Sequence, residues 1–345
     1  MKAKISFIIV SSILAAILSK TVLACIWDRD TLAMERQRFP SALELIIGKF
    51  VRHSEGFYRW RVKDRLKKLE TSPNDLFLYD DLAVSYDKIG EHDKAIEIIL
   101  KKETIKPGLY ETYANLGTFY IHAGRYAEGM QYIDKAIQIN PSAHFGREIY
   151  QRLLVEYLMN LKQDGSVNLP LAKLATGPFI SGGFYNFLVK KKSETRTGNQ
   201  PGNKDLTRSE VKAAVKGILG MMKFGEYRSP VLLEVLADLL RSGGMDEDAK
   251  QLAVRAYLRA SYEADDIESK RAYRMLAWKV VSGIPMINEQ IDERFLKSYE
   301  SKLQSEVSQA ETWYARIRTD EAKWIAEGRD PEKEFERKYY GKITR

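Results

Sequence analysis

The chain has 345 residues, of which 44% are hydrophobic and 30% are charged, and its formal net charge is +8. This length is enough for one large or two ordinary domains with a buried core, and this composition argues against widespread disorder. The excess positive charge is scattered rather than concentrated in a patch, so we expect no nucleic-acid partner.

The first 24 residues have the features of an export signal. Lys2 and Lys4 precede an apolar run over residues 5–18, and Lys20 follows it. The run is shorter than the ~20 residues that a membrane-spanning helix needs. Without residues 1–24 the chain keeps 52 basic and 47 acidic side chains, a net charge of only +5. We therefore predict a cleaved signal peptide and an exported protein.

The end of this segment, Val22-Leu23-Ala24-Cys25, resembles the lipobox of bacterial lipoproteins, although Leu23 is larger than the residue usual there. The resemblance implies a lipid on Cys25 that anchors the protein to a membrane and faces it to the periplasm. Since Ile26 follows in place of Asp, the outer membrane is favoured. Cys25 is the sole cysteine, and lipidation would consume its thiol. Cleavage after Ala24 without lipid, giving a soluble periplasmic protein, and an intermolecular disulfide are the alternatives.

Residues 25–72 predict an N-terminal helical segment. After a breaker at Phe39-Pro40-Ser41, apolar residues recur at helical spacing between Leu43 and Phe50. A second helix is expected from Phe57 to Leu69. Its basic residues are Arg59, Arg61, Lys63, Arg65, Lys67 and Lys68. We interpret them as a solvated helix face, and contact with anionic lipid headgroups is the alternative.

Three prolines, Pro73, Pro107 and Pro141, stand 34 residues apart, and the residues between them repeat in phase. The recurring pairs are Tyr79 and Tyr113, Leu82 and Leu116, Ala83 and Gly117, Tyr86 and Tyr120, Gly90 and Gly124, Ala95 and Gly129, and Ile99 and Ile133. A fixed period of this size is typical of stacked helical hairpins. Small residues would let paired helices cross closely, and the turn glycines would end each first helix.

These two segments, residues 76–108 and 110–142, resemble tetratricopeptide repeats. The resemblance implies an all-α solenoid of helical hairpins, here with additional C-terminal helices. One departure is Lys102, which stands where a small residue is usual. Residues 143–161 continue as a helix without the consensus, and we interpret them as a capping unit.

The resemblance also implies a concave groove that binds a protein or peptide. The groove positions carried over to this chain are Phe77, Asp80, Val84, Asp87, Lys88, Glu111, Ala114, Thr118, Ile121 and His122. Acidic residues flank an apolar floor, which suits an extended or amphipathic peptide of some basic character. The Lys and Asn arrangement of repeats that clamp a chaperone's C-terminal carboxylate is missing. The alternative is that the chain's own C-terminal helices fill the groove.

The rest of the chain predicts a loop followed by more helices. Residues 163–206 contain glycines, an aromatic stretch and a polar tract, typical of a loop or linker. We interpret the aromatic stretch as a buried segment, and a partner contact is the alternative. Thr207 and Glu210 form a capping box, and residues 233–256 resemble a degenerate repeat. A helix over residues 267–281 and a long amphipathic helix after Pro285 follow, the latter packing along the solenoid or pairing with another chain.

The sequence holds no strong catalytic, nucleotide or metal motif. The four histidines, His53, His92, His122 and His144, are dispersed without ligand spacing, so we assign them structural roles. We expect no enzyme activity, no cofactor and no metal, and an envelope enzyme with an unrecognised carboxylate site is the rival. The predicted parts are a signal peptide (1–24), an N-terminal helical segment (25–72), repeats with a capping helix (73–162), a loop or linker (163–206) and a C-terminal helical region (207–345). The predicted function is protein–protein interaction in the envelope, in an unknown oligomeric state.

Overall fold

The structure is a computed structural model that describes residues 26–162, 167–174, 180–181, 183–194, 205–242, 247–282 and 293–341. The predicted signal peptide and Cys25 lie outside these residues, as do the polar tract 195–204 and Pro285. Within the described part of the chain, every helix is too short or too polar to cross a membrane.

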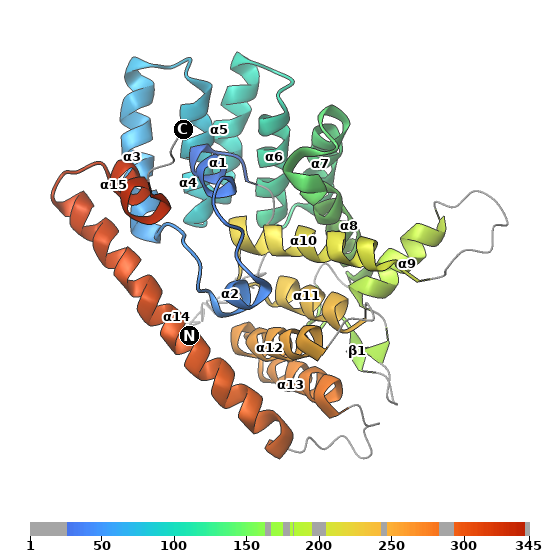
Figure 1. The fold of residues 1–345 in the computed structure, drawn as a ribbon. Coiled ribbons are helices and arrows are strands. Elements are labelled where there is room, and N and C mark those ends of the chain that lie inside the picture. Colours follow the sequence, from blue (N-terminus) through green and yellow to red (C-terminus); the bar gives the residue numbers. More distant parts are fainter. Residues whose placement is uncertain are drawn as a thin grey trace, which may run out of the picture.

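The described residues form a succession of helices with one short pair of antiparallel strands (Figure 1). The N-terminal part holds α1 (Arg29–Glu35), α2 (Ala42–Ile47) and α3 (Glu55–Thr71), and the middle part holds α4 (Leu76–Lys88), α5 (His92–Ile105), α6 (Tyr110–His122), α7 (Tyr126–Ile139), the 3-10 turn η1 (Ala143–Gly146) and α8 (Arg147–Leu161). The later part holds β1 (Lys173–Leu174), β2 (Ile180–Ser181), α9 (Phe184–Glu194), α10 (Arg208–Phe224), α11 (Pro230–Ser242), α12 (Glu247–Glu263), α13 (Ile267–Ser282), α14 (Glu293–Ala326), α15 (Pro331–Phe335) and the π-helical turn η2 (Glu336–Tyr340). The predicted fold class, an all-α repeat solenoid with additional C-terminal helices, is confirmed.

Helices α4 to α7 form the two predicted hairpins, and their backbones cross closely where the small residues recur. A Cβ atom added at Gly117 would lie 2.7 Å from Cγ1 of Ile133 and 3.2 Å from the carbonyl oxygen of Gly129. Gly90 and Gly124 end the first helix of each hairpin with φ angles of 82° and 75°, which only glycine adopts without strain. The 34-residue period therefore corresponds to one hairpin.

We predict that Gly117→Val lowers the free energy of unfolding by about 3 kcal/mol, because the added side chain would clash with the backbone of α7, which cannot move away. Chemical denaturation measures the change. Gly56→Ala is the matched control, since only the Ser54 side chain lies near a Cβ at Gly56, at an ordinary 3.6 Å. A Gly117→Val protein as stable as the wild type would contradict the close crossing of α6 and α7.

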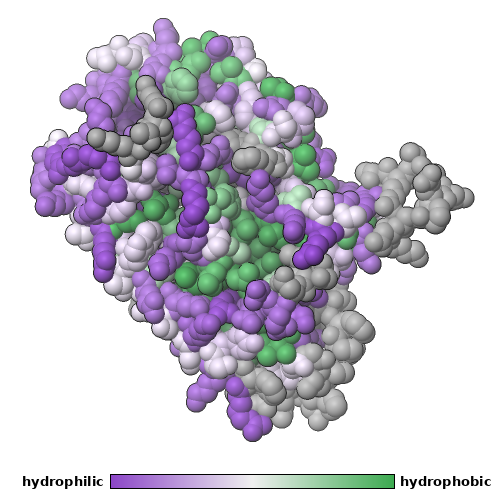
Figure 2. All heavy atoms as spheres, in the orientation of Figure 1, coloured by the Kyte–Doolittle hydropathy of each residue, from purple (hydrophilic) through white to green (hydrophobic). Residues whose placement is uncertain are grey.

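The solenoid continues past the repeats and curves, so that α8 packs against α10 and then α11, α12 and α13 follow in sequence. The main core lies here and includes Leu45, Ile46 and Ile47 of α2, which fills the inner side of the curve. Hydrophobic residues gather in the middle of the face seen in Figure 2, and hydrophilic residues surround them.

The segment expected to be a loop or linker, residues 163–206, contains the strand pair and α9. The aromatic residues Phe184 and Tyr185 and the nearby Leu188 are buried in the main core. Glu234 of α11 holds the residues before the aromatic stretch in place. Its carboxylate oxygens accept hydrogen bonds from the amides of Leu171 and Ala172 at 2.8 and 2.7 Å. For these described residues, the aromatic stretch is a buried segment and not a partner contact.

The long helix α14 crosses the molecule from α12 and α13 back to α3, and so joins the end of the chain to its beginning (Figure 1). Leu303, Ala310 and Ile317 of its predicted apolar stripe are buried. At the far end, the buried carboxylate of Glu321 accepts hydrogen bonds from His53 Nδ1 at 2.6 Å and from the Ser54 amide at 2.9 Å. Helix α14 therefore lies along the solenoid and connects its last helices, α12 and α13, to α3 near its start.

His53 is the centre of this closure. Its ring lies between those of Phe57 and Phe335, with centroids 3.7 and 3.8 Å away, and Asp30 Oδ1 lies 3.6 Å from its Nε2. Burial opposes the charge of the ring, but the carboxylates of Asp30 and Glu321 outweigh it and raise the pKa of His53 to about 9. A charged imidazolium therefore joins the N-terminal segment to α14 at neutral pH.

We predict that His53 stabilises the fold fully below pH 6.5, its ordinary pKa, and that this stabilisation is lost as the pH rises through about 9. The loss is on the order of 3 kcal/mol, from 1.36 kcal/mol for each unit of pKa. Denaturation curves of wild type and His53→Gln between pH 6 and 9.5 measure it as a difference that shrinks with pH. A constant difference across this range would contradict the charged state of His53.

Candidate functional site

The predicted groove residues lie on the inner sides of α4 and α6, and most of them are covered by the chain itself. Seven are buried, namely Asp80, Val84, Asp87, Ala114, Thr118, Ile121 and His122. Lys88 and Glu111 are partly exposed, and Phe77 is 50% exposed. The covering parts are the N-terminal residues 26–31 and the C-terminal end of α10.

Residues 26–31 are held by their backbone at equivalent positions of the two repeats. Asn115 of α6 accepts the amide of Trp27 at 2.8 Å and donates to the Trp27 carbonyl oxygen at 2.9 Å. Asp81 of α4, which precedes Asn115 by one 34-residue period, accepts the amide of Arg29 at 3.2 Å. The concave face therefore holds residues 26–28 and the first turn of α1 through one polar side chain from each repeat. We did not identify Asn115 or Asp81 as groove residues, although their common phase in the repeat was visible.

The side chains of this segment enter the apolar floor. Ile26 is 1% exposed and packs in one cluster with Ala83, Val84 and Leu116. Trp27 meets Tyr110 edge to face, with ring centroids 6.0 Å apart. Ile26 and Trp27 therefore cover Val84 and Ala114, whereas Ile121 belongs to the main core and Phe77 is half exposed.

Arg61 of α3 neutralises the two acidic residues of the segment. Its guanidinium is fully buried, donates to Asp28 at 2.7 Å and to Ser85 Oγ at 2.6 Å, and pairs with Asp30. Asp28 also caps α1 by accepting the Thr31 amide at 2.7 Å. The buried charges are therefore paired and hydrogen-bonded, as burial requires.

The interpretation of the basic helix as a solvated face is wrong for two of its six basic residues. Arg61 and Arg65 are fully buried, whereas Arg59, Lys63, Lys67 and Lys68 are exposed. Arg65 binds Asp81 at 2.9 Å and pairs with Asp64 and with Glu332 of α15. The spacing of four places both arginines on one helix face, and that face meets carboxylates rather than water.

The acidic residues of the groove are also neutralised from within the chain. Lys102 binds both oxygens of Asp80 at 2.7 Å, which explains why a lysine replaces the usual small residue of the repeat. Burial raises the pKa of Asp80 to about 7 despite this lysine. Asp87 accepts hydrogen bonds from His122 at 2.6 Å and His92 at 2.8 Å. These carboxylates therefore provide little free charge to attract a basic peptide.

The groove is closed on its other side by α10. Lys88 donates to the carbonyl oxygens of Phe224 and Gly225 at 2.6 and 3.1 Å. A cavity of about 160 Å³ remains between the segment and α10, and Asp28, His53 and Lys88 are among its lining residues. This cavity would hold only a few water molecules or a very small ligand.

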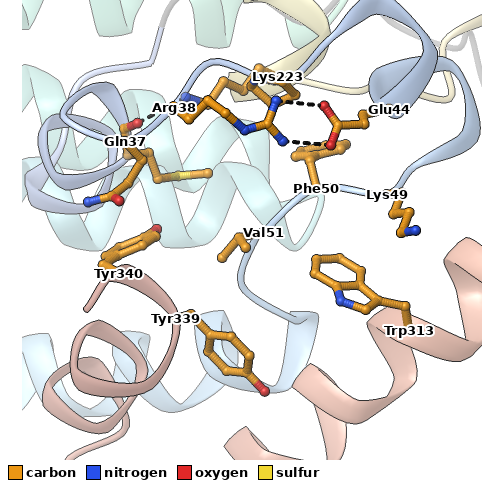
Figure 3. A pocket seen from close by; sticks show the side chains of 12 residues that line it. Gln37, Arg38, Glu44, Lys49, Phe50, Val51, Lys223, Trp313, Tyr339 and Tyr340 are labelled. Carbon is orange, nitrogen blue, oxygen red and sulfur yellow. Dashed lines mark hydrogen bonds and ion pairs between the residues drawn. The ribbon is translucent and has the colours of Figure 1, made fainter.

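A larger cavity, of about 300 Å³, lies between the N-terminal segment and α14 (Figure 3). Its aromatic lining residues include Phe50, Trp313, Tyr339 and Tyr340. The basic lining residues are Arg38, Lys49 and Lys223. Arg38 forms a two-pronged pair with Glu44 at 2.6 and 3.0 Å. This size is at the lower limit of small-molecule sites.

Lys223 is the most unusual of the lining residues. Burial lowers its pKa to about 8, although Glu35 counteracts the effect. Its ammonium donates to the Met34 carbonyl oxygen at 2.9 Å and lies 4.7 Å from the Phe224 ring centroid. The lysine therefore links α10 to the N-terminal segment.

Helix α11 in the C-terminal half carries two buried carboxylates, Glu234 and Asp238, which bear on the rival hypothesis of a carboxylate site. Burial raises the pKa of Glu234 to about 7, although the amides of Ala172 and Leu171 and the hydroxyl of Tyr273 oppose this shift. Asp238 accepts the Tyr185 amide at 2.7 Å and pairs with Arg241. Both carboxylates are occupied in holding the segment before and within α9.

The fold and the geometry of the concave face define a tetratricopeptide-type solenoid, a class of structure that mediates protein–protein interaction. Residues 110–142 match the tetratricopeptide repeat family. A curated protein, "Small glutamine-rich tetratricopeptide repeat-containing protein 2" of Mycosarcoma maydis, is 27% identical over 111 residues. The match covers 32% of this chain and 30% of that protein, so the chain spans less than a third of this relative.

We predict that Arg61→Ala lowers the free energy of unfolding by about 4 kcal/mol, because it leaves the buried Asp28 carboxylate unpaired. Arg59→Ala on the same helix is the control. Its pair with Glu55 has side chains 60% and 64% exposed, and its loss should cost less than about 1 kcal/mol. Equal stabilities of the two variants in urea would contradict the role of Arg61.

Proposed function

We propose that this protein is an exported scaffold of the cell envelope, which binds a protein partner through its repeats and is held to a membrane by a lipid on Cys25. The repeat architecture supports the partner, since such repeats mediate protein–protein interaction. The signal-like residues 1–24 and the lipobox-like sequence before the sole cysteine support the anchor.

The main support for the proposal is that side chains of the concave face form hydrogen bonds to the main chain of another segment. Asn115 and Asp81 hold Trp27 and the start of α1 at Arg29 by hydrogen bonds to their backbone, which shows that side chains of this face can bind another segment through its main chain. Residues 26–31 already take the inner part of the face. The partner therefore binds at the rim, where Phe77 is half exposed and carries the Arg29 guanidinium 5.4 Å from its ring centroid.

The burial of the residue after Cys25 limits how far a lipid on that cysteine would lie from the folded body. Ile26 follows Cys25 directly and is buried in the solenoid. A lipid on Cys25 would therefore begin one residue from the folded body, without a flexible spacer. The distance between the membrane and the partner-binding rim at Phe77 would then be limited by the size of the folded body.

We predict that Phe77→Glu lowers crosslinked recovery of a defined partner at least tenfold, since a charge replaces the apolar contact at the rim. Ile267→Glu is the matched control, because Ile267 lies in α13 and is 78% exposed. Ile121→Glu is unsuitable, since the fully buried Ile121 belongs to the core. Equal recovery with folded Phe77→Glu and with wild type would refute binding at the rim.

The anchor is tested separately by intact-mass measurement of the protein purified from its native membrane fraction. A mass increase on an N-terminal Cys25 peptide supports lipidation. An unmodified Cys25 would leave a soluble periplasmic scaffold as the remaining form of the proposal.

A further inference from the structure

Asp87 and His92, which are five residues apart, meet the distant His122 at the junction of the two repeats. Asp87 ends α4, His92 begins α5, and His122 ends α6. Oδ1 of Asp87 lies 2.8 Å from His92 Nδ1 and 2.6 Å from His122 Nδ1. One potential ligand atom of each residue lies within 4.8 Å of the others. No sequence spacing showed this cluster, because the hairpin turn and the 34-residue period bring its members together.

The cluster combines one carboxylate with two imidazole rings. Burial opposes ionisation of Asp87, but the charges and hydrogen bonds of His122 and His92 hold its pKa well below the usual range. Burial lowers the pKa of His122 although Asp87 opposes this. Burial also opposes the charge of His92, but the hydrogen bond and the charge of Asp87 outweigh it and raise the pKa of His92. One carboxylate and neutral imidazole are the donor types of divalent first-row transition metals.

An independent observation is the second nitrogen of His122. His122 is 2% exposed, and its Nε2 atom has no hydrogen-bond partner among the residues that the structure describes. Buried polar atoms are nearly always partnered by protein, water or an ion. His122 thus has a second nitrogen, besides the Nδ1 atom that binds Asp87, that the described residues leave without a partner.

From this geometry we propose that Asp87, His92 and His122 bind one divalent transition-metal ion of the Zn²⁺ type. Three protein ligands leave the fourth tetrahedral position for water. Imidazole ligands favour such an ion over Mg²⁺ or Ca²⁺, which take oxygen ligands. The His92 side chain is 25% exposed and provides the entry from solvent.

Metal entry changes the cluster in a defined way. The hydrogen bonds of 2.6 and 2.8 Å are shorter than the separation of about 3.3 Å between ligands of tetrahedral zinc. An Nδ1 atom that binds the ion together with Oδ1 of Asp87 must therefore move away from that oxygen by about half an ångström, and each imidazole nitrogen that becomes a ligand must give up any proton it carries. Binding is thus weakened at low pH. Since the ligands come from both hairpins, the ion joins the two repeats.

Co²⁺ titration of the untagged, chelator-treated protein tests the proposal, because tetrahedral Co²⁺ absorbs visible light strongly. We expect one Co²⁺ per chain, displacement by Zn²⁺, and a rise in Tm with Zn²⁺. His92→Gln should weaken binding at least tenfold while the fold survives, because this residue is partly exposed. Glu91→Gln is the matched control, since Glu91 is adjacent and its side chain is 49% exposed.

Asp87→Asn provides a second variant, with folding checked by circular dichroism. Wild-type protein that binds no Co²⁺, or His92→Gln that binds it as tightly as wild type, would overturn the site. Neither result affects the partner test at Phe77, which does not involve these residues.

Discussion

The ion pairs of Arg61 with Asp28 and Asp30 are the interaction on which the rest of the structure depends. A solenoid of two regular hairpins has an apolar inner face that must be covered, and the covering segment carries two carboxylates. Their burial is tolerable only because a fully buried guanidinium meets both of them. With these charges paired, Ile26 can cover the apolar floor, and Asn115 can bind the backbone beside it.

The same segment connects the repeats to the rest of the molecule. Asp30 also approaches His53, and His53 binds Glu321 of α14, so the covered groove and the closing helix share one network of charges. Further along, α2 enters the main core formed by the later helices. Buried residues of the segment 26–53 therefore join the repeats to the later helices, and exposed parts, such as the rim at Phe77, are where another protein can bind.

Much of the repeat region could be predicted from the sequence. Small residues and turn glycines at a fixed period defined α4 to α7, because helix crossing and helix termination are local requirements. The cover could not be predicted, since Asp28 and Arg61 are 33 residues apart and each looks like a surface residue alone. Likewise, the sequence does not show that Lys102 pairs with Asp80, or that His92 and His122 both bind Asp87. Buried polar pairs depend on tertiary contacts that a periodic pattern does not encode.

The central claim is that the concave face holds the chain's own residues 26–31. Hydrogen exchange at the amides of Trp27 and Arg29 tests it most directly, because Asn115 and Asp81 accept these two hydrogens. We expect both amides to exchange as slowly as amides in the middle of α6, and the Trp27 amide to exchange faster in Asn115→Ala. Exchange of both amides at the rate of an unstructured peptide, while α6 stays protected, would contradict it.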